Sequence, residues 1–226
     1  MFTPANKERG FTLLEVVAVL LVFGLIIAGI FAVFTYSSQG FRQAVLQQGL
    51  SGEMESVQRK LSADFRASHY GTVAVVPRDA TSGGVDVSRD ALSFTTLSDW
   101  RDPANFHPTG LPRWDRYLVY YPTLDESGRL IRQLVDSGVL FAPVPYADLA
   151  LNISELPETN AGLLQSTTLS ENVLSFKVET NDARQLLEVN LRLRDRGGRV
   201  AGTNRQVDET REVVFSMDAL NTFPRL

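Results

Sequence analysis

Residues 10–34 read GFTLLEVVAVLLVFGLIIAGIFAVF, a nearly uninterrupted apolar segment. After its first glycine, only Thr12 and Glu15 are polar. A helix over the 24 residues that follow this glycine would be roughly 36 Å long at ~1.5 Å per residue, and the hydrocarbon core of a bilayer is ~30 Å thick. We therefore expect residues 11–35 to form a transmembrane helix.

Two other interpretations of this segment compete with a retained transmembrane helix. A secretory signal peptide is the first, but its apolar region usually has ~7–15 residues, and no A-x-A cleavage site follows this one. A generic membrane anchor that contains Glu15 by chance is the second. A carboxylate inside the bilayer costs on the order of 2.5–3.5 kcal/mol, which favours a functional partner for Glu15. Lys7 and Arg9 precede the helix and predict that the N-terminus stays cytoplasmic.

The hexapeptide GFTLLE, residues 10–15, lies between a basic leader and an apolar helix and resembles the class III signal of type IV pilins and type II secretion pseudopilins. In that family a membrane prepilin peptidase cuts after the glycine and methylates the new N-terminus. The resemblance implies a leader peptide of residues 1–10, cleavage between Gly10 and Phe11, and N-methylation of Phe11. It also implies that Glu15 acts in subunit assembly. A carboxylate there can neutralise the N-terminal cation of a neighbouring subunit, so that two costly charges become tolerable as a pair.

After Phe34 the hydrophobic pattern changes from uniformly apolar to amphipathic. Apolar residues then recur every three or four positions, at Leu46, Leu50, Met54, Val57, Leu61 and Phe65. The pattern predicts that the helix continues over residues 36–70 and packs this stripe against the following domain. Gly71 is the predicted C-terminal cap, at the end of the helix near residues 69–71. Three glycines weaken the helix and could bend it: Gly40, Gly49 and Gly52.

From residue 71 onward the hydrophobic period is two, which predicts strands. The predicted strands are residues 72–76, 91–96, 117–121, 130–135, 173–179, 187–193 and 212–217. Four of them form two hairpins, with turns at residues 125–128 and 180–182. The predicted fold class is α+β: a long N-terminal transmembrane and amphipathic helix packed on a mostly antiparallel β-sheet globular domain of residues 71–226, as in pilins.

The globular part also carries a looser resemblance. The order WDRYLVYY…GRLIRQLV, followed by LEVNLRLRDRGGR…REVVFSM, is most similar to J-type minor pseudopilins of type II secretion and W-type minor pilins. Many major pilins close a C-terminal loop with a disulfide, and this chain of 226 residues has no cysteine. The larger size of the chain and its lack of cysteine favour a minor subunit over the main filament protein.

The expected function is therefore non-enzymatic: a minor pilin or pseudopilin that enters or primes a type IV pilus or a type II secretion pseudopilus. The resemblance implies prepilin peptidase, other major and minor subunits, the inner-membrane assembly platform and the membrane itself as partners. Before assembly, the globular domain would lie in the periplasm, attached by one span of the inner membrane. The alternative is an adhesin or DNA-uptake binding module at a pilus tip. No cofactor is expected.

Two clusters in the globular part are candidate sites with structural alternatives. Aromatic side chains among four prolines between Trp100 and Pro122 could form a partner surface, although we favour their fixing a loop onto the sheet. An acid–base group is conceivable in the same region, from Asp99, Asp102, His107 and Asp115. No nucleophile motif accompanies it, so we expect these carboxylates to cap turns.

Two further clusters could bind ions or nucleic acid. Asp125, Glu126 and the carbonyls around Gly128 could bind calcium, but the order D-x-[DN]-x-[DN]-G is missing and a solvated hairpin turn is favoured. The basic run, which could contact DNA phosphates, comprises Arg192, Arg194, Arg196, Arg199, Arg205 and Arg211. Acidic residues alternate with it and the net charge is −4, so we expect an ion-paired strand face and no nucleic-acid partner. No metal site is predicted.

Overall fold

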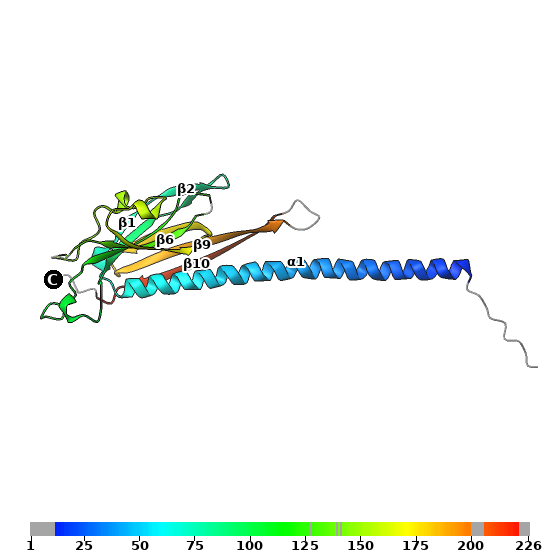
Figure 1. Cartoon of the computed structure of the whole chain (residues 1–226), viewed down its shortest axis with the longest axis horizontal. Coiled ribbons are helices and arrows are strands. Elements are labelled where there is room, and N and C mark those ends of the chain that lie inside the picture. The colour runs from blue at the N-terminus through cyan, green and yellow to red at the C-terminus, as the bar shows by residue number, and fades with distance from the viewer. Residues whose placement is uncertain (1–11, 127, 139, 141, 200–205, 222–226) are drawn as a thin grey trace, which may run out of the picture. The chain divides into compact units, whose positions relative to one another are not determined.

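The computed structural model of this chain describes residues 12–126, 128–138, 140, 142–199 and 206–221. The chain divides into two compact units, Met1–Val45 and Leu46–Leu226. Helix α1 (Leu13–Arg66) runs through both and has 54 residues (Figure 1). The helix assignment continues without interruption through Gly40, Gly49 and Gly52.

The second unit contains the C-terminal part of α1, and its apolar stripe is buried as predicted. Five side chains of this stripe form one face of the main core: Leu50, Met54, Val57, Leu61 and Phe65. Phe65 packs edge-on against Phe94, with the ring centroids 5.3 Å apart, and Phe94 stacks on Tyr120. The spacing of three and four places these residues on one side of the helix, which explains why the pattern predicted the packing.

The end of α1 differs from the prediction. The helix ends at Arg66, and Gly71 belongs to a separate 3-10 helix, η1 (Tyr70–Thr72). The last carbonyls are capped by the C-terminal part of the chain: Leu220 N donates to Arg66 O at 3.0 Å and Asn221 Nδ2 to Ala67 O at 2.9 Å. A distant segment therefore satisfies the groups that a glycine cap was expected to satisfy.

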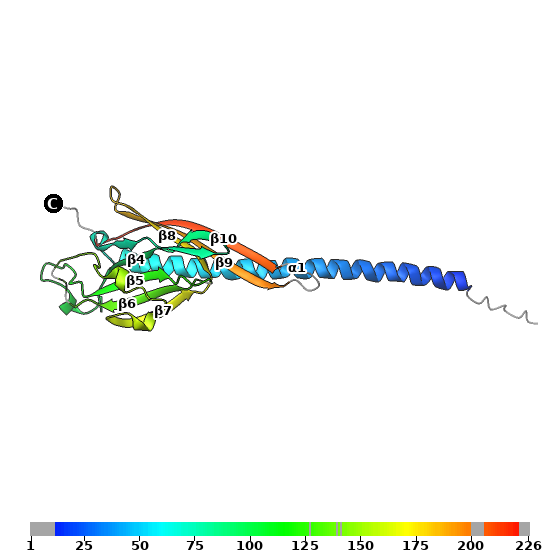
Figure 2. The ribbon, with the colours of Figure 1, turned by 90° about the horizontal axis from the view of Figure 1, so that it is seen from above.

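Three antiparallel sheets make up the rest of this unit (Figure 2). The five-stranded sheet has the order β1 (Ala74–Val76), β4 (Ala91–Thr96), β5 (Arg116–Pro122), β6 (Leu130–Asp136), β7 (Leu163–Ser170). The three-stranded sheet has the order β10 (Gln206–Asp218), β9 (Leu186–Arg199), β8 (Val173–Asn181), and the small ribbon pairs β2 (Asp79–Ser82) with β3 (Val85–Ser88). Three further 3-10 helices lie in loops: η2 (Pro103–Asn105), η3 (Leu149–Leu151) and η4 (Pro157–Thr159). The predicted α+β, pilin-like fold class is confirmed.

Both predicted hairpins are present, with one shift. Strands β5 and β6 pair across the turn that was expected between them. Strands β8 and β9 also pair, but β8 extends to Asn181 and the turn occupies residues 182–185, where Gln185 has a φ of 54°. The prediction placed this turn two residues too early, because the polar residues at the end of β8 resemble a turn although they still pair with β9.

Strands β2, β3 and β7 were not predicted. In β7, five consecutive residues are exposed, so the strand shows no alternation of buried and exposed positions. The ribbon strands have four residues each. A period-two pattern needs one buried face, and these segments lack it or are too short to show it.

Alternation along β5 divides the five-stranded sheet between two cores. Leu118 and Tyr120 point into the main core with α1, whereas Tyr117, Val119 and Tyr121 point into a second core on the opposite face. The segment between β6 and β7 covers this second core. The covering backbone accepts hydrogen bonds from the sheet, since Tyr117 Oη donates to Val144 O at 3.0 Å and Tyr121 Oη donates to Ser154 O at 2.9 Å.

A polar contact fixes α1 on the five-stranded sheet. Arg132 Nε of β6 donates to Asp64 Oδ2 at 2.7 Å, and the Tyr120 hydroxyl of β5 donates to the same oxygen. Burial, reinforced by the Asp64 charge, raises the pKa of Tyr120, so this hydroxyl remains a proton donor. The carboxylate therefore links one turn of the helix to two adjacent strands.

Phe65→Ala should lower the free energy of unfolding by about 3–5 kcal/mol, because it removes a fully buried ring and leaves a cavity next to Phe94. Arg59→Ala, at an exposed position on the same helix, is the control and should change stability by less than about 0.5 kcal/mol. Urea unfolding of the detergent-solubilised chain, followed by tryptophan fluorescence, measures both. Equal effects for the two variants would contradict the packing described.

Candidate processing and assembly site

The first turn of α1 contains Glu15 and is closed by a capping box. Thr12 Oγ1 accepts a hydrogen bond from Glu15 N at 3.3 Å, and Glu15 Oε2 accepts from Thr12 N at 3.2 Å. The Thr12 hydroxyl also donates to Glu15 Oε2 at 3.2 Å. These reciprocal bonds satisfy backbone N–H groups at the start of the helix, which have no carbonyl partner within the helix. A negative charge in the first turn also complements the helix dipole.

Around this turn and beyond it, α1 presents apolar side chains on all sides. Leu13, Leu14 and Phe34 are 85 %, 80 % and 70 % exposed in the isolated chain. The most apolar window of 18 residues has a mean hydropathy of 3.1 and none of it is buried, so the helix is long and apolar enough to cross a membrane. The Thr35 hydroxyl donates to Phe31 O at 2.8 Å, so one of its few polar groups is satisfied within the helix. Such a surface requires lipid or other apolar helices around it.

The predicted site residues are described only in part. Gly10 and Phe11, on either side of the expected cleavage, lie outside the described residues. Glu15 is described, and its bonds to Thr12 are a structural role that the sequence analysis missed. The signal was present, because Thr12 and Glu15 have the T-x-x-E spacing of a capping box.

Comparison with known proteins identifies the same N-terminal segment. Residues 5–31 match the family described as the prokaryotic N-terminal methylation motif. No curated protein and no solved structure matches the chain significantly. The matched residues include the start of α1, the apolar helix on which the antiparallel sheets of the second unit pack. The match supports assignment of the chain to the type IV pilin and pseudopilin family.

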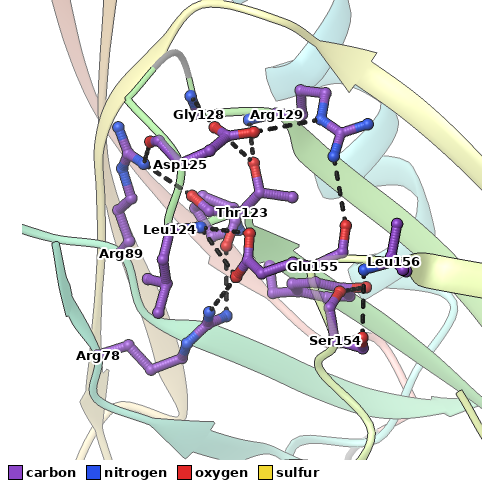
Figure 3. A network of polar contacts seen from close by, with 12 residues as sticks. Arg78, Arg89, Thr123, Leu124, Asp125, Gly128, Arg129, Ser154, Glu155 and Leu156 are labelled. Carbon is purple, nitrogen blue, oxygen red and sulfur yellow. Dashed lines mark hydrogen bonds and ion pairs between the residues drawn. The ribbon is translucent and has the colours of Figure 1, made fainter. Parts of the chain in front are cut away.

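The candidate calcium site is the hairpin turn between β5 and β6. The side chain of Arg89, from the segment between β3 and β4, reaches into this turn (Figure 3). Arg89 is fully buried, and its guanidinium donates to Thr123 O at 2.7 Å and to Asp125 O of the turn. On β8 it donates to Val173 O at 3.0 Å and Leu174 O at 3.4 Å. Burial lowers the pKa of Arg89, and the nearby Asp125 carboxylate opposes that effect.

The carboxylates near this turn are also engaged in protein contacts (Figure 3). Asp125 Oδ1 accepts from Gly128 N at 2.7 Å, and Glu155 accepts from Leu124 N at 2.8 Å and from Arg78 at 3.3 Å. Gly128 has a φ of 70°, and a Cβ there would lie 2.1 Å from Val173 O. The turn is thus closely packed around the guanidinium. Within the described residues, no group of three or more His, Cys, Asp or Glu side chains could hold a metal ion.

Two of the acidic residues of the predicted acid–base group, Asp99 and Asp102, cap turns as favoured from sequence, and Asp115 instead links two distant segments. Asp99 accepts from Arg101 N at 2.8 Å and Asp102 accepts from Ala104 N at 2.9 Å, at the start of η2. Asp115 accepts from Ser98 N at 2.8 Å. His107 lies in a separate pocket.

The aromatic loop is partly buried. Trp114 and Tyr117 are each 4 % exposed, and Tyr117 stacks on Tyr146 with the ring centroids 4.6 Å apart. Trp100 is 38 % exposed but contacts Trp114 edge-on, with the centroids 6.0 Å apart. Most of this aromatic surface therefore fixes the loop, as favoured from sequence.

Arg192 and Arg194 of the arginine run are ion-paired. Arg194 forms a bidentate salt bridge with Asp208, and Arg192 Nε lies 3.8 Å from Glu212 Oε2. The side chains of Arg196, Arg199 and Arg205 lie outside the described residues. Carboxylates from β10 alternate with these arginines across the ladder, which makes a continuous phosphate-binding surface unfavourable.

Arg89→Met should lower the free energy of unfolding by about 3 kcal/mol, because backbone carbonyls of the turn and of β8 lose their donor in a buried site. Arg101→Met, at an exposed arginine, is the matched control and should leave stability nearly unchanged. Chemical denaturation of the two variants and the wild type gives the comparison. A loss confined to the control variant would show that Arg89 does not hold the turn.

Proposed function

We propose that this protein is a minor pilin or pseudopilin, a structural subunit that is incorporated into, or primes, a type IV pilus or a type II secretion pseudopilus. The observation that carries the proposal is the methylation motif at residues 5–31 on a helix whose apolar surface is exposed on all sides. A subunit of this kind is stored in the membrane and exchanges lipid for the helices of other subunits when it joins a filament.

The proposed organisation follows from the motif and the charge pattern. Residues 1–10 form a leader that prepilin peptidase removes, residues 11–35 the membrane and filament-core helix, residues 36–70 its amphipathic continuation, and residues 71–226 the globular domain. Lys7 and Arg9 keep the leader cytoplasmic, so the globular domain faces the periplasm before assembly. Assembly requires the inner-membrane platform and a separate ATPase.

Glu15 has two proposed roles that act at different stages. In the single chain its carboxylate caps the first turn through Thr12. In a filament it neutralises the N-terminal amine of Phe11 in an adjacent subunit, because an unpaired charge is costly in an apolar environment. The pairing requires one axial register, so the carboxylate selects the correct position of the incoming subunit.

A minor role is supported by the absence of cysteine and by the resemblance of the strand sequences to J-type pseudopilins and W-type pilins. A tip adhesin or DNA-uptake module would need a compact basic or aromatic surface. Arg192 and Arg194 face carboxylates, and Trp114 is buried, so no observation on the described residues favours that alternative.

In cells that contain prepilin peptidase, the mature wild-type chain should begin at N-methylated Phe11. Gly10→Ala should remain full length, because the peptidase needs a residue without a side chain at the cut. Gly24→Ala is the matched control and should be processed, since a Cβ at Gly24 meets no atom within 4 Å in the isolated chain. Intact mass spectrometry of membrane extracts measures all three. A wild-type chain that remains full length, or is cut after Ser37, would contradict the proposal.

Glu15→Gln separates the two proposed roles of Glu15. Glutamine keeps the acceptor that a capping box uses but removes the charge. If pairing with the N-terminal amine drives assembly, the variant should be processed and stable in the membrane but depleted from purified filaments by about tenfold, a loss of about 1.4 kcal/mol. Quantitative mass spectrometry of membrane and filament fractions measures the ratio. Wild-type incorporation of Glu15→Gln together with poor incorporation of Glu15→Ala would assign capping alone to this residue.

A further inference from the structure

The connection from α1 to the sheets runs through the short 3-10 helix η1, and the side chain of His69 caps the start of η1. The backbone of His69 is extended, with a φ of −118° and a ψ of 128°, and its Nδ1 accepts a hydrogen bond from Gly71 N at 3.0 Å. A Cβ at Gly71 would lie 3.0 Å from His69 Cε1, so the imidazole ring lies directly against this glycine. The histidine therefore acts as the N-cap, a position that Asn, Asp or Ser usually occupies.

Helix η1 joins three parts of the second unit. The Thr72 hydroxyl, in a fully buried residue, donates to His69 O at 2.7 Å and accepts from Thr95 N of β4 at 3.1 Å. The Tyr70 hydroxyl donates at 2.8 Å to Oδ1 of Asp182, in the turn between β8 and β9. A change at the cap of η1 therefore affects the attachment of the end of α1 to both larger sheets.

The hydrogen bond from Gly71 requires a neutral imidazole. A neutral ring has one N–H and one acceptor nitrogen, whereas a protonated ring has an N–H on both nitrogens and accepts no hydrogen bond. Because Nδ1 of His69 is the acceptor, a proton added to the ring goes to Nδ1 itself and faces the N–H of Gly71. Protonation therefore breaks the cap and sets two donors against each other. An unperturbed histidine has a pKa of ~6.5, so acidification within the range of pH 5–8 is sufficient.

The described surroundings of His69 do not favour a charge on its ring. His69 and His107 line one pocket, whose other described lining residues are uncharged: Leu111, Pro112, Trp114, Leu140, Ala142 and Pro143. Arg66, in the last turn of α1, and His107 are both cationic at low pH and would oppose a second positive charge. The carboxylates of Asp115 and Asp182 already accept hydrogen bonds of their own, from a backbone N–H and from a tyrosine hydroxyl.

We propose that His69 is a pH-sensitive cap, which closes η1 while its imidazole is neutral and opens η1 when the ring is protonated. The stability that the cap contributes is then fully present at neutral and alkaline pH and is lost as the pH falls. Opening of η1 loosens the attachment of the end of α1 to β4 and to the β8–β9 turn. The proposal does not depend on the proposed function. In a filament subunit, it would make the globular domain less rigid in an acidic medium.

His69→Asn separates capping from titration, because asparagine offers an acceptor at the cap position but takes up no proton in this pH range. Urea unfolding of the detergent-solubilised full chain, followed by circular dichroism, is compared at pH ~7.5 and pH ~5. Between these values the unfolding equilibrium constant of the wild type should rise about fivefold more than that of His69→Asn. His107→Asn is the matched control, since it removes the other histidine of the pocket and should keep the wild-type pH dependence. Equal pH dependence of the wild type and His69→Asn would overturn the proposal.

Nitrogen NMR of the histidine-labelled wild-type chain in detergent micelles tests the bond directly, with His69→Asn assigning the signals. At neutral pH, Nδ1 of His69 should carry no proton. On acidification it should become protonated, and the Gly71 amide should lose its protection from hydrogen exchange over the same pH range. A proton on Nδ1 at neutral pH, or protection of Gly71 that persists after Nδ1 is protonated, would also overturn the proposal.

Discussion

The burial of one stripe of α1 is the interaction on which the globular unit depends. Leu50, Val57 and Phe65 lie on the same side of the helix and pack against side chains from both larger sheets. The two larger sheets share no strand. Side chains of α1 pack against the inner faces of both, and the three elements together form a single core. Asp64 adds a directional contact, since one carboxylate accepts bonds from two neighbouring strands. Without the helix, each sheet would expose one apolar face to water.

The same helix serves two different environments, and its sequence changes accordingly. Up to Phe34 its side chains are almost all apolar and exposed, whereas from Leu50 onward one stripe is buried and the remaining positions are mostly polar. The helix assignment continues through Gly40, where the pattern changes.

Buried polar groups determine the details of the strand connections. Arg89 donates hydrogen bonds to four carbonyls of the β5–β6 turn and of β8, and so joins the two larger sheets. On the other face, Gln133 is fully buried and bonds to Pro157 O and to Asn160, which fixes the segment that covers the second core. These networks satisfy backbone groups that would otherwise be buried without partners. They also explain why the turn needs Gly128, whose position leaves no room for a side chain.

The sequence by itself determined the helix, its change from uniformly apolar to amphipathic, the two hairpins and the processing motif. Each of these depends on residues close in the chain, through a period of 3.6 or 2 or through a short spacing. The tertiary structure alone decided where α1 ends, because Leu220 and Asn221 cap it from more than 150 residues away. It also decided that Arg89 fills the β5–β6 turn and that the second core is covered by a loop. These features depend on contacts between distant segments, whose pairing is set by packing and by the need to satisfy buried polar groups, and no local period records them.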